Sequence, residues 1–100
     1  MNGFGVTRVH YHDPQQRDFI EAVKVIEFEE RDGRLDLKKE REWSRKALLN
    51  EVKFNHDVFV LFDLDDLGPH LETVEVQGRR YLRTDRRMFP HDFIAGLPEF

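Results

Sequence analysis

The stretch "FIEAVKVIEFEE", residues 19–30, indicates that this chain builds a β-sheet. Ile20 and the other apolar residues at even positions are expected on one face of a strand, interrupted by Lys24. Val23 and Val25 are expected on the other face. Apolar residues on both faces are typical of a covered strand. The stretch therefore predicts a strand whose middle is buried on both sides.

Two further strands and two tight turns flank this stretch. Residues 6–12 alternate in polarity like a strand, and "DVFVLFDL", residues 57–64, is rich in β-branched and aromatic residues. "RDGR", residues 31–34, is typical of a tight turn because Asp-Gly adopts positive φ easily. Residues 71–84 predict a hairpin that turns at Gln77 and Gly78. The "DDLGP" stretch is expected to break the strand before it.

One helix is expected at residues 45–53. Ser44 is a good N-cap, although Ala47 stands where a capping box has Glu or Gln. Leu48 and Val52 are one turn apart and form an apolar stripe. The charged residues 35–43 before it fit a helix and an exposed edge strand about equally well.

The predicted fold class is α+β. We expect a mostly antiparallel β-sheet of about five strands, with one main α-helix packed on one face. A short C-terminal helical turn is expected at residues 93–96, with Asp92 as its cap. Phe89, Phe93, Leu97 and Phe100 are expected to form a hydrophobic closing segment. A chain of 100 residues predicts a single domain, residues 1–100.

The composition excludes several classes of protein. The chain has no cysteine, so disulfides, thiolate nucleophiles and cysteine metal sites are excluded. Its longest apolar run, residues 58–62, is too short to span a bilayer, and we see no secretory signal. A cytoplasmic protein without a membrane partner is expected. Residues 1–78 carry 11 basic and 17 acidic side chains, whereas residues 79–100 carry 5 and 3.

The basic tail is the main candidate for binding. An arginine beside an exposed aromatic ring is suited to single-stranded nucleic acid, and arginines also bind acidic proteins. Surface charge without a ligand is the ordinary alternative. Arg83 is expected to pair with Asp85 or Glu75 and to hold the hairpin, with Gly78 at its turn. The candidate binding residues are Arg79, Arg80, Tyr81, Arg86 and Arg87.

The remaining candidates for chemistry are incomplete. His10 and His12 share one strand face and form a weak metal candidate, whose third ligand would come from His56, His70 or His91. Asp63, Asp65 and Asp66 are better explained as turn residues than as Mg²⁺ or Ca²⁺ ligands. Ser44, the only serine, has no surrounding nucleophile motif. We therefore expect no enzyme and no cofactor.

Several strings occur in the order typical of a bacterial family of unknown function, DUF3892. They are "AVKV" at residues 22–25, Ser44-Arg45, "VEV" at residues 74–76, "GRRYLRTD" at residues 78–85, Asp92 and "LPEF" at residues 97–100. The chain resembles that family over nearly its whole length. It departs from the pattern at Ala47, at Phe93-Ile94 and in the long, charged residues 27–43. The resemblance implies one domain of bacterial or phage origin and no particular activity.

The function expected from these observations is a non-enzymatic cytoplasmic protein-binding or accessory module with an unidentified protein partner. The alternatives are a nucleic-acid-binding module that uses the arginines of residues 79–87, and a metal-assisted hydrolase at His10 and His12. A monomer and a homodimer formed through an exposed edge strand are both compatible with the sequence.

Overall fold

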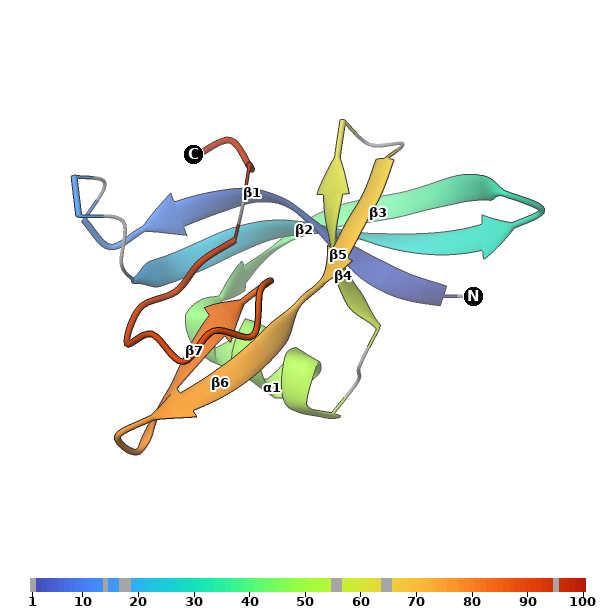
Figure 1. The fold of residues 1–100 in the computed structure, drawn as a ribbon. Helices are drawn as coiled ribbons and strands as arrows, with labels where there is room; N and C mark the ends of the chain where they lie inside the picture. Colours follow the sequence, from blue (N-terminus) through green and yellow to red (C-terminus); the bar gives the residue numbers. More distant parts are fainter. Residues whose placement is uncertain (1, 14, 17–18, 55–56, 64–65, 95) are drawn as a thin grey trace.

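The computed structural model describes residues 2–13, 15–16, 19–54, 57–63, 66–94 and 96–100. Within these ranges the chain forms seven strands and one helix (Figure 1). In chain order they are β1 (Asn2–Tyr11), β2 (Ile20–Arg31), β3 (Arg34–Ser44), α1 (Arg45–Phe54), β4 (Val58–Phe62), β5 (Asp66–His70), β6 (Glu72–Val76) and β7 (Arg79–Arg83).

Five strands form one sheet in the order β3-β2-β1-β4-β5, and β6 and β7 form a separate hairpin. The neighbours in the sheet are antiparallel except for β1 and β4, which are parallel. The chain crosses through helix α1 between β3 and β4, so β4 runs in the same direction as β3. β1 also runs in this direction, which makes β1 and β4 a parallel pair. The α+β class with one helix is confirmed. The main sheet has five strands and is mixed, because one of its neighbouring pairs is parallel, and β6 and β7 form a separate hairpin.

Both predicted tight turns are present. Asp32 and Gly33 have φ of 50° and 78°, and Gln77 and Gly78 have φ of 52° and 79°. Positive φ at both central residues is the backbone twist that matches a two-residue hairpin. These turns connect β2 with β3 and β6 with β7.

Two segments are strands where the sequence was ambiguous or misleading. The charged residues 35–43 belong to β3, which pairs with β2 from Arg34 to Ser44. Most of its side chains are exposed, which suits an edge strand. β4 ends at Phe62, and "DLGPH" then forms a further strand, β5, that the sequence did not suggest. Pro69 fits there because β5 is the other edge and pairs only with β4.

The expected C-terminal helical turn is wrong for the residues of 93–96 that the structure describes, since none of them is helical. Phe93 instead forms a parallel bridge with Arg83. Its backbone N–H donates to the Leu82 carbonyl at 2.8 Å, and its carbonyl accepts from the Thr84 N–H at 3.1 Å. The segment after β7 therefore extends the hairpin.

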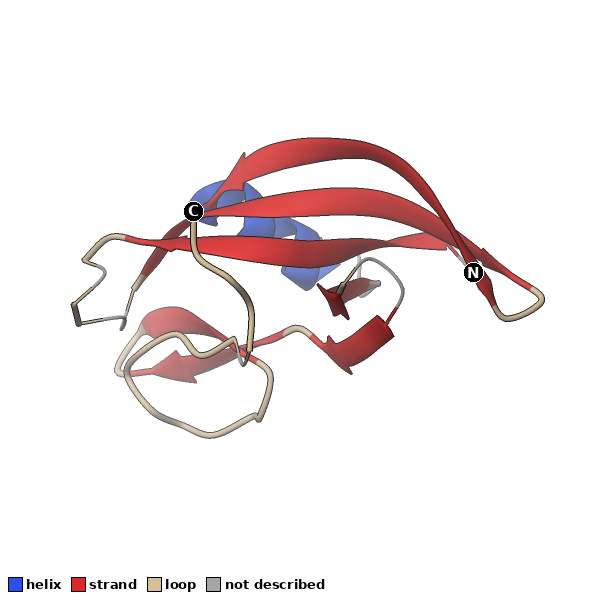
Figure 2. Ribbon diagram, turned by 90° about the horizontal axis from the view of Figure 1, so that it is seen from above, coloured by secondary structure: helices blue, strands red, loops and turns tan. Residues whose placement is uncertain are grey.

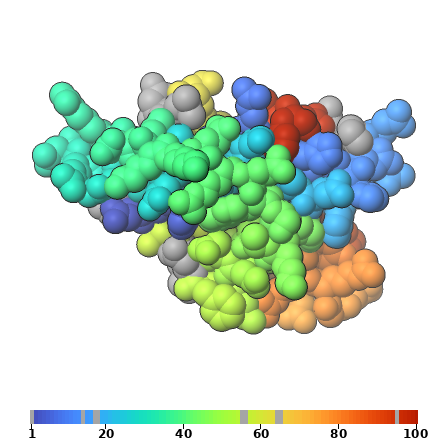
Figure 3. Space-filling model, turned by 180° about the vertical axis from the view of Figure 1, so that it is seen from behind, coloured from blue at the N-terminus to red at the C-terminus, as the bar shows by residue number. Residues whose placement is uncertain are grey.

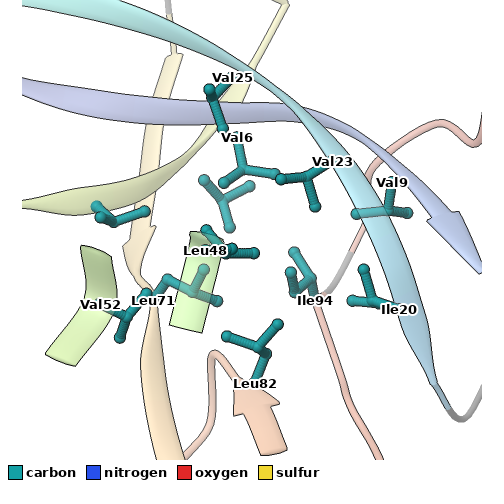
Figure 4. Close-up of a cluster of buried hydrophobic side chains, with 12 residues drawn as sticks. Val6, Val9, Ile20, Val23, Val25, Leu48, Val52, Leu71, Leu82 and Ile94 are labelled. Carbon is teal, nitrogen blue, oxygen red and sulfur yellow. The ribbon is translucent and has the colours of Figure 1, made fainter. Parts of the chain in front are cut away.

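The core lies between the sheet, helix α1 and the β6–β7 hairpin (Figures 2 and 4). Helix α1 contributes Leu48 and Val52, as its apolar stripe predicted. Ser44 caps the helix, because its Oγ accepts the Ala47 N–H at 3.2 Å. Figure 4 shows Leu48 and Val52 of the helix in one cluster with the valines of the sheet. The buried cluster consists of Val6, Val9, Ile20, Val23, Val25, Leu48, Val52, Val58, Val60, Leu71, Leu82 and Ile94.

A β-bulge changes the expected alternation in β2. His10 of β1 pairs with Ala22, and Tyr11 pairs with Ile20, so Glu21 is an extra residue in β2. Two residues then oppose one on the partner strand. Ile20 therefore joins Val23 in the core cluster, although strict alternation placed them on opposite faces.

The molecule is elongated, with principal extents of 41 × 25 × 20 Å. The β2–β3 hairpin reaches one end, and the β6–β7 hairpin forms a separate projection (Figure 3). No helix within the described ranges is long and apolar enough to cross a membrane.

Candidate functional site

The predicted binding residues of β7 lie on two faces of the β6–β7 hairpin. Arg79, Tyr81 and Arg83 alternate along one face, and Arg80 belongs to the other. Tyr81 is only 8% exposed and Arg83 only 2%, while Arg79 and Arg80 are exposed. Tyr81 is therefore buried, and the expectation that its ring stacks on a base is wrong for this conformation.

Arg83 is the buried centre of a group of side chains, which we call the Arg83 cluster. Its Nε and Nη2 donate to the two carboxylate oxygens of Asp85 at 2.6 and 2.8 Å, and its Nη1 donates to the His91 carbonyl at 3.0 Å. The guanidinium lies 5.3 Å from the ring centroid of Phe89 and 5.2 Å from that of Phe93. Pairing with Asp85 is one of the two pairings that the sequence suggested, and it ties the end of β7 to the segment that follows.

The electrostatics of this pair follow from the two-point hydrogen bond. The guanidinium of Arg83 holds the pKa of the Asp85 carboxyl well below its usual value. The carboxylate in turn raises the pKa of Arg83. Both side chains are therefore charged at neutral pH.

A second buried cluster is centred on Asp92, whose carboxylate is fully buried. It accepts the backbone N–H groups of Ile20 at 2.7 Å and Leu82 at 2.8 Å, and it is paired with Arg45 Nη1. Arg45 also packs 4.0 Å from the ring centroid of Phe19. Asp92 thus joins β2, α1, β7 and the C-terminal segment, whereas the sequence suggested only a local cap.

Residues 85–93, which we call the 85–93 loop, connect the two clusters. Three apolar side chains of this loop are exposed: Met88 by 62%, Phe89 by 46% and Phe93 by 40%. The rings of Phe89 and His91 are stacked, with centroids 5.7 Å apart. Phe89 and Phe93 were expected inside a closing segment, but they flank Arg83 and leave one side in solvent. The structure therefore presents an apolar surface on a loop that is anchored at both ends.

The candidate arginines of residues 79–87 differ in their partners. Arg86 donates to both carboxylate oxygens of Glu72 in β6, and this contact lowers the pKa of Glu72. Among the described residues, the side chains of Arg79, Arg80 and Arg87 form no hydrogen bond or ion pair with another side chain. These three guanidinium groups are the ones most readily available to a ligand.

The two candidate metal ligands lie at the end of β1. His10 Nδ1 is 2.5 Å from the carbonyl oxygen of Phe100. The Glu21 carboxylate lies 3.6 Å from His10 Nε2 and 3.9 Å from His12 Nδ1. Glu21 was not singled out from the sequence, because only the bulge in β2 brings it beside the two histidines.

The expected third ligands lie in other surroundings. The His70 ring packs edge-on against Phe59, with centroids 4.9 Å apart, and His91 stacks on Phe89. His56 lies outside the described residues. Within the part of the chain that is described, no three His, Asp or Glu side chains are already arranged to enclose a metal ion.

The other candidates for chemistry have local structural roles. Ser44 Oγ accepts the Ala47 N–H and so serves as the helix cap. Asp63 has a φ of 51°, which fits a turn, and Asp66 begins β5. Asp65 lies outside the described residues.

No family model, curated protein or solved structure matches the chain. The resemblance to the DUF3892 family therefore stays a prediction.

Proposed function

We propose that the protein is a non-enzymatic, cytoplasmic protein-binding module of bacterial or phage origin, and that the 85–93 loop is its contact surface. The observation that carries the proposal is the exposure of Met88, Phe89 and Phe93, by 62%, 46% and 40%, on a loop held by the buried side chains of Arg83 and Asp92. Contiguous exposed apolar side chains are typical of interaction surfaces.

The anchoring of the loop favours binding. A flexible loop loses conformational entropy when it binds, and a preorganised one loses less. Asp85 and Asp92 already fix both ends of the loop through Arg83, Leu82 and Ile20. Aromatic and arginine side chains in such a setting are the groups that most often dominate binding energy.

The exposed arginines of the 85–93 loop and of the β6–β7 hairpin indicate the chemistry of the partner. Arg79 and Arg87 are exposed, and Arg86 pairs with Glu72 on the surface. An acidic partner segment with one or two apolar side chains would satisfy the arginines and cover the rings. Such a partner is a protein rather than a small molecule.

The test compares proteins retained from cells of the source organism by the wild-type protein and by a Met88→Ala/Phe89→Ala variant. The matched control is Phe54→Ala, because Phe54 is 74% exposed at the end of α1. We expect a specific protein to be retained by the wild type and the control and lost from the double variant, with unchanged melting curves. The same proteins on all three samples, or none on the wild type, would reject the proposal.

A nucleic-acid-binding module is the second candidate, and the stacked Phe89–His91 pair on the loop that carries the exposed Arg87 supports it. Stacked rings next to arginines are suited to single-stranded nucleic acid. Binding would weaken steeply with salt and would be reduced in an Arg79→Ala/Arg87→Ala variant. A gel shift at low salt that shows no complex with single-stranded or double-stranded probes would eliminate this candidate.

A further inference from the structure

The bulge in β2 creates a group of three potential ligands that sequence spacing alone does not reveal. Glu21 is the extra residue of the bulge, beside the pairs His10–Ala22 and Tyr11–Ile20. Bulges redirect side chains, and this one brings the Glu21 carboxylate to 3.6 Å from His10 Nε2 and 3.9 Å from His12 Nδ1. His12 follows directly after the end of β1, and the Glu21 carboxylate lies within 3.9 Å of both histidine rings.

The hydrogen bond between His10 Nδ1 and Phe100 leaves Nε2 as the nitrogen of His10 that can bind a metal ion. Its Nδ1 lies 2.5 Å from the Phe100 carbonyl oxygen, and a carbonyl oxygen only accepts, so Nδ1 carries the hydrogen. In the neutral ring Nε2 then has a lone pair, and it faces a carboxylate oxygen of Glu21 at 3.6 Å. A cation placed between these two acceptors would be bound by both.

We propose that His10 Nε2, His12 Nδ1 and the Glu21 carboxylate bind a divalent transition-metal ion of the Zn²⁺ type. Zinc bonds to histidine nitrogen at about 2.0–2.1 Å and to carboxylate oxygen at about 2.0–2.2 Å, so two donors of one ion lie at most about 4.3 Å apart. The observed separations of 3.6 and 3.9 Å are within this limit. Nitrogen and oxygen donors of this kind suit zinc, copper and nickel better than magnesium or calcium.

The remaining rearrangement is confined to exposed side chains. The described residues include no three ligands that already enclose an ion, so His12 and Glu21 must turn toward His10. Their side chains are 72% and 54% exposed, and rotamer changes of exposed side chains displace no packed neighbours. Three protein ligands would leave a fourth position to water.

The surroundings of His10 resemble the outer shell of metal-bound histidines. Such histidines usually donate their other ring N–H to a carbonyl or carboxylate, which fixes the ring. Here the acceptor is Phe100, whose own N–H donates to the Val9 carbonyl at 3.0 Å. Lys24 lies 5.1 Å from the Phe100 ring, but its ammonium is 3.2 Å from the Glu42 carboxylate, which offsets its repulsion of a cation. Metal binding would thereby stabilise the contact between β1 and the C-terminal segment.

Titration of chelator-treated protein with zinc chloride, followed by calorimetry and by the histidine ring resonances in NMR spectra, tests the proposal. We expect one ion per chain and shifts at His10 and His12. Glu21→Gln and His12→Ala should each weaken binding by about tenfold or more, at least as much as loss of an outer-shell partner does. These two variants keep the His10–Phe100 hydrogen bond, so their effect does not depend on the packing of the C-terminal segment.

His91→Ala is the matched control, because His91 stacks on Phe89 and lies outside the proposed site. Its affinity for zinc should equal that of the wild type. The proposal is overturned if the wild-type protein binds no zinc, if Glu21→Gln binds it as tightly as the wild type, or if His91→Ala abolishes binding. Glu21→Gln and His12→Ala leave the 85–93 loop unchanged, so their effect on zinc binding is independent of the proposed protein partner.

Discussion

Asp92→Ala should lower the free energy of unfolding more than alanine substitutions of the exposed Asp and Glu residues do. The side chain is fully buried and accepts the N–H groups of Ile20 and Leu82 at 2.7 and 2.8 Å. Each buried N–H left without a partner costs about 1–3 kcal/mol. Arg45, whose side chain is 13% exposed, loses its counter-ion, and breaking a buried ion pair costs about 3–5 kcal/mol. These terms overlap, so we expect a total loss of about 4 kcal/mol.

Two further variants separate the contributions. Asp92→Asn keeps one carbonyl oxygen as acceptor but removes the charge, and we expect a loss of about 2 kcal/mol. Arg45→Met removes the cation while keeping an apolar stem beside Phe19. If the ion pair contributes, the double variant Asp92→Asn/Arg45→Met should be more stable than the sum of the single effects predicts.

The assay is urea unfolding at neutral pH, followed by circular dichroism. Asp36→Asn on the exposed edge strand β3 is the control and should change stability by less than about 0.5 kcal/mol. Since small domains have about 5–15 kcal/mol of stability, the loss in Asp92→Ala should be a large shift in midpoint. A loss below about 1 kcal/mol, with unchanged slope, would refute the role assigned to Asp92.

Two other outcomes follow from the same part of the molecule. Arg83 holds the folded-state pKa of Asp85 below the unfolded value of about 3.9. The ionised Asp85 carboxylate therefore stabilises the fold fully above the unfolded pKa, and this stabilisation is lost as the pH falls toward the folded-state pKa. Asp85→Asn should therefore be less stable than the wild type near neutral pH and lose less stability on acidification, and parallel curves in urea titrations across this range would contradict this. Gly78→Ala should destabilise by about 1 kcal/mol because φ is 79° there, while no heavy atom lies within 4 Å of the added Cβ, so the effect is purely conformational. A thermal melt equal to that of the wild type would show that the turn tolerates a side chain.

The features that local chemistry determines could be predicted from the sequence. Asp32-Gly33 and Gln77-Gly78 form the expected turns, because the glycine of each pair adopts positive φ at low cost. Helix α1 begins after Ser44 as predicted, and its stripe of Leu48 and Val52 is buried. In each case a few residues that are neighbours in the sequence are enough to predict the structure.

The features that depend on distant partners could not be predicted. β3 is charged and lacks a clear apolar face, and it is a strand because β2 offers it a partner along its length. The contact between Asp92 and the Ile20 N–H joins residues 72 positions apart. The position of Glu21 beside His10 depends on one inserted residue, and strand alternation contains no sign of it.

The burial of the arginines explains which of them are suitable for binding. Arg83 is occupied by Asp85 and the His91 carbonyl, so its removal would disturb the fold before it could reveal a binding role. Arg86 would have to leave Glu72 before it could reach a ligand. Arg79 and Arg87 meet neither obstacle, and both are exposed. A binding defect in Arg79→Ala/Arg87→Ala with an intact fold is therefore stronger evidence for a ligand than the same defect in any variant of Arg83.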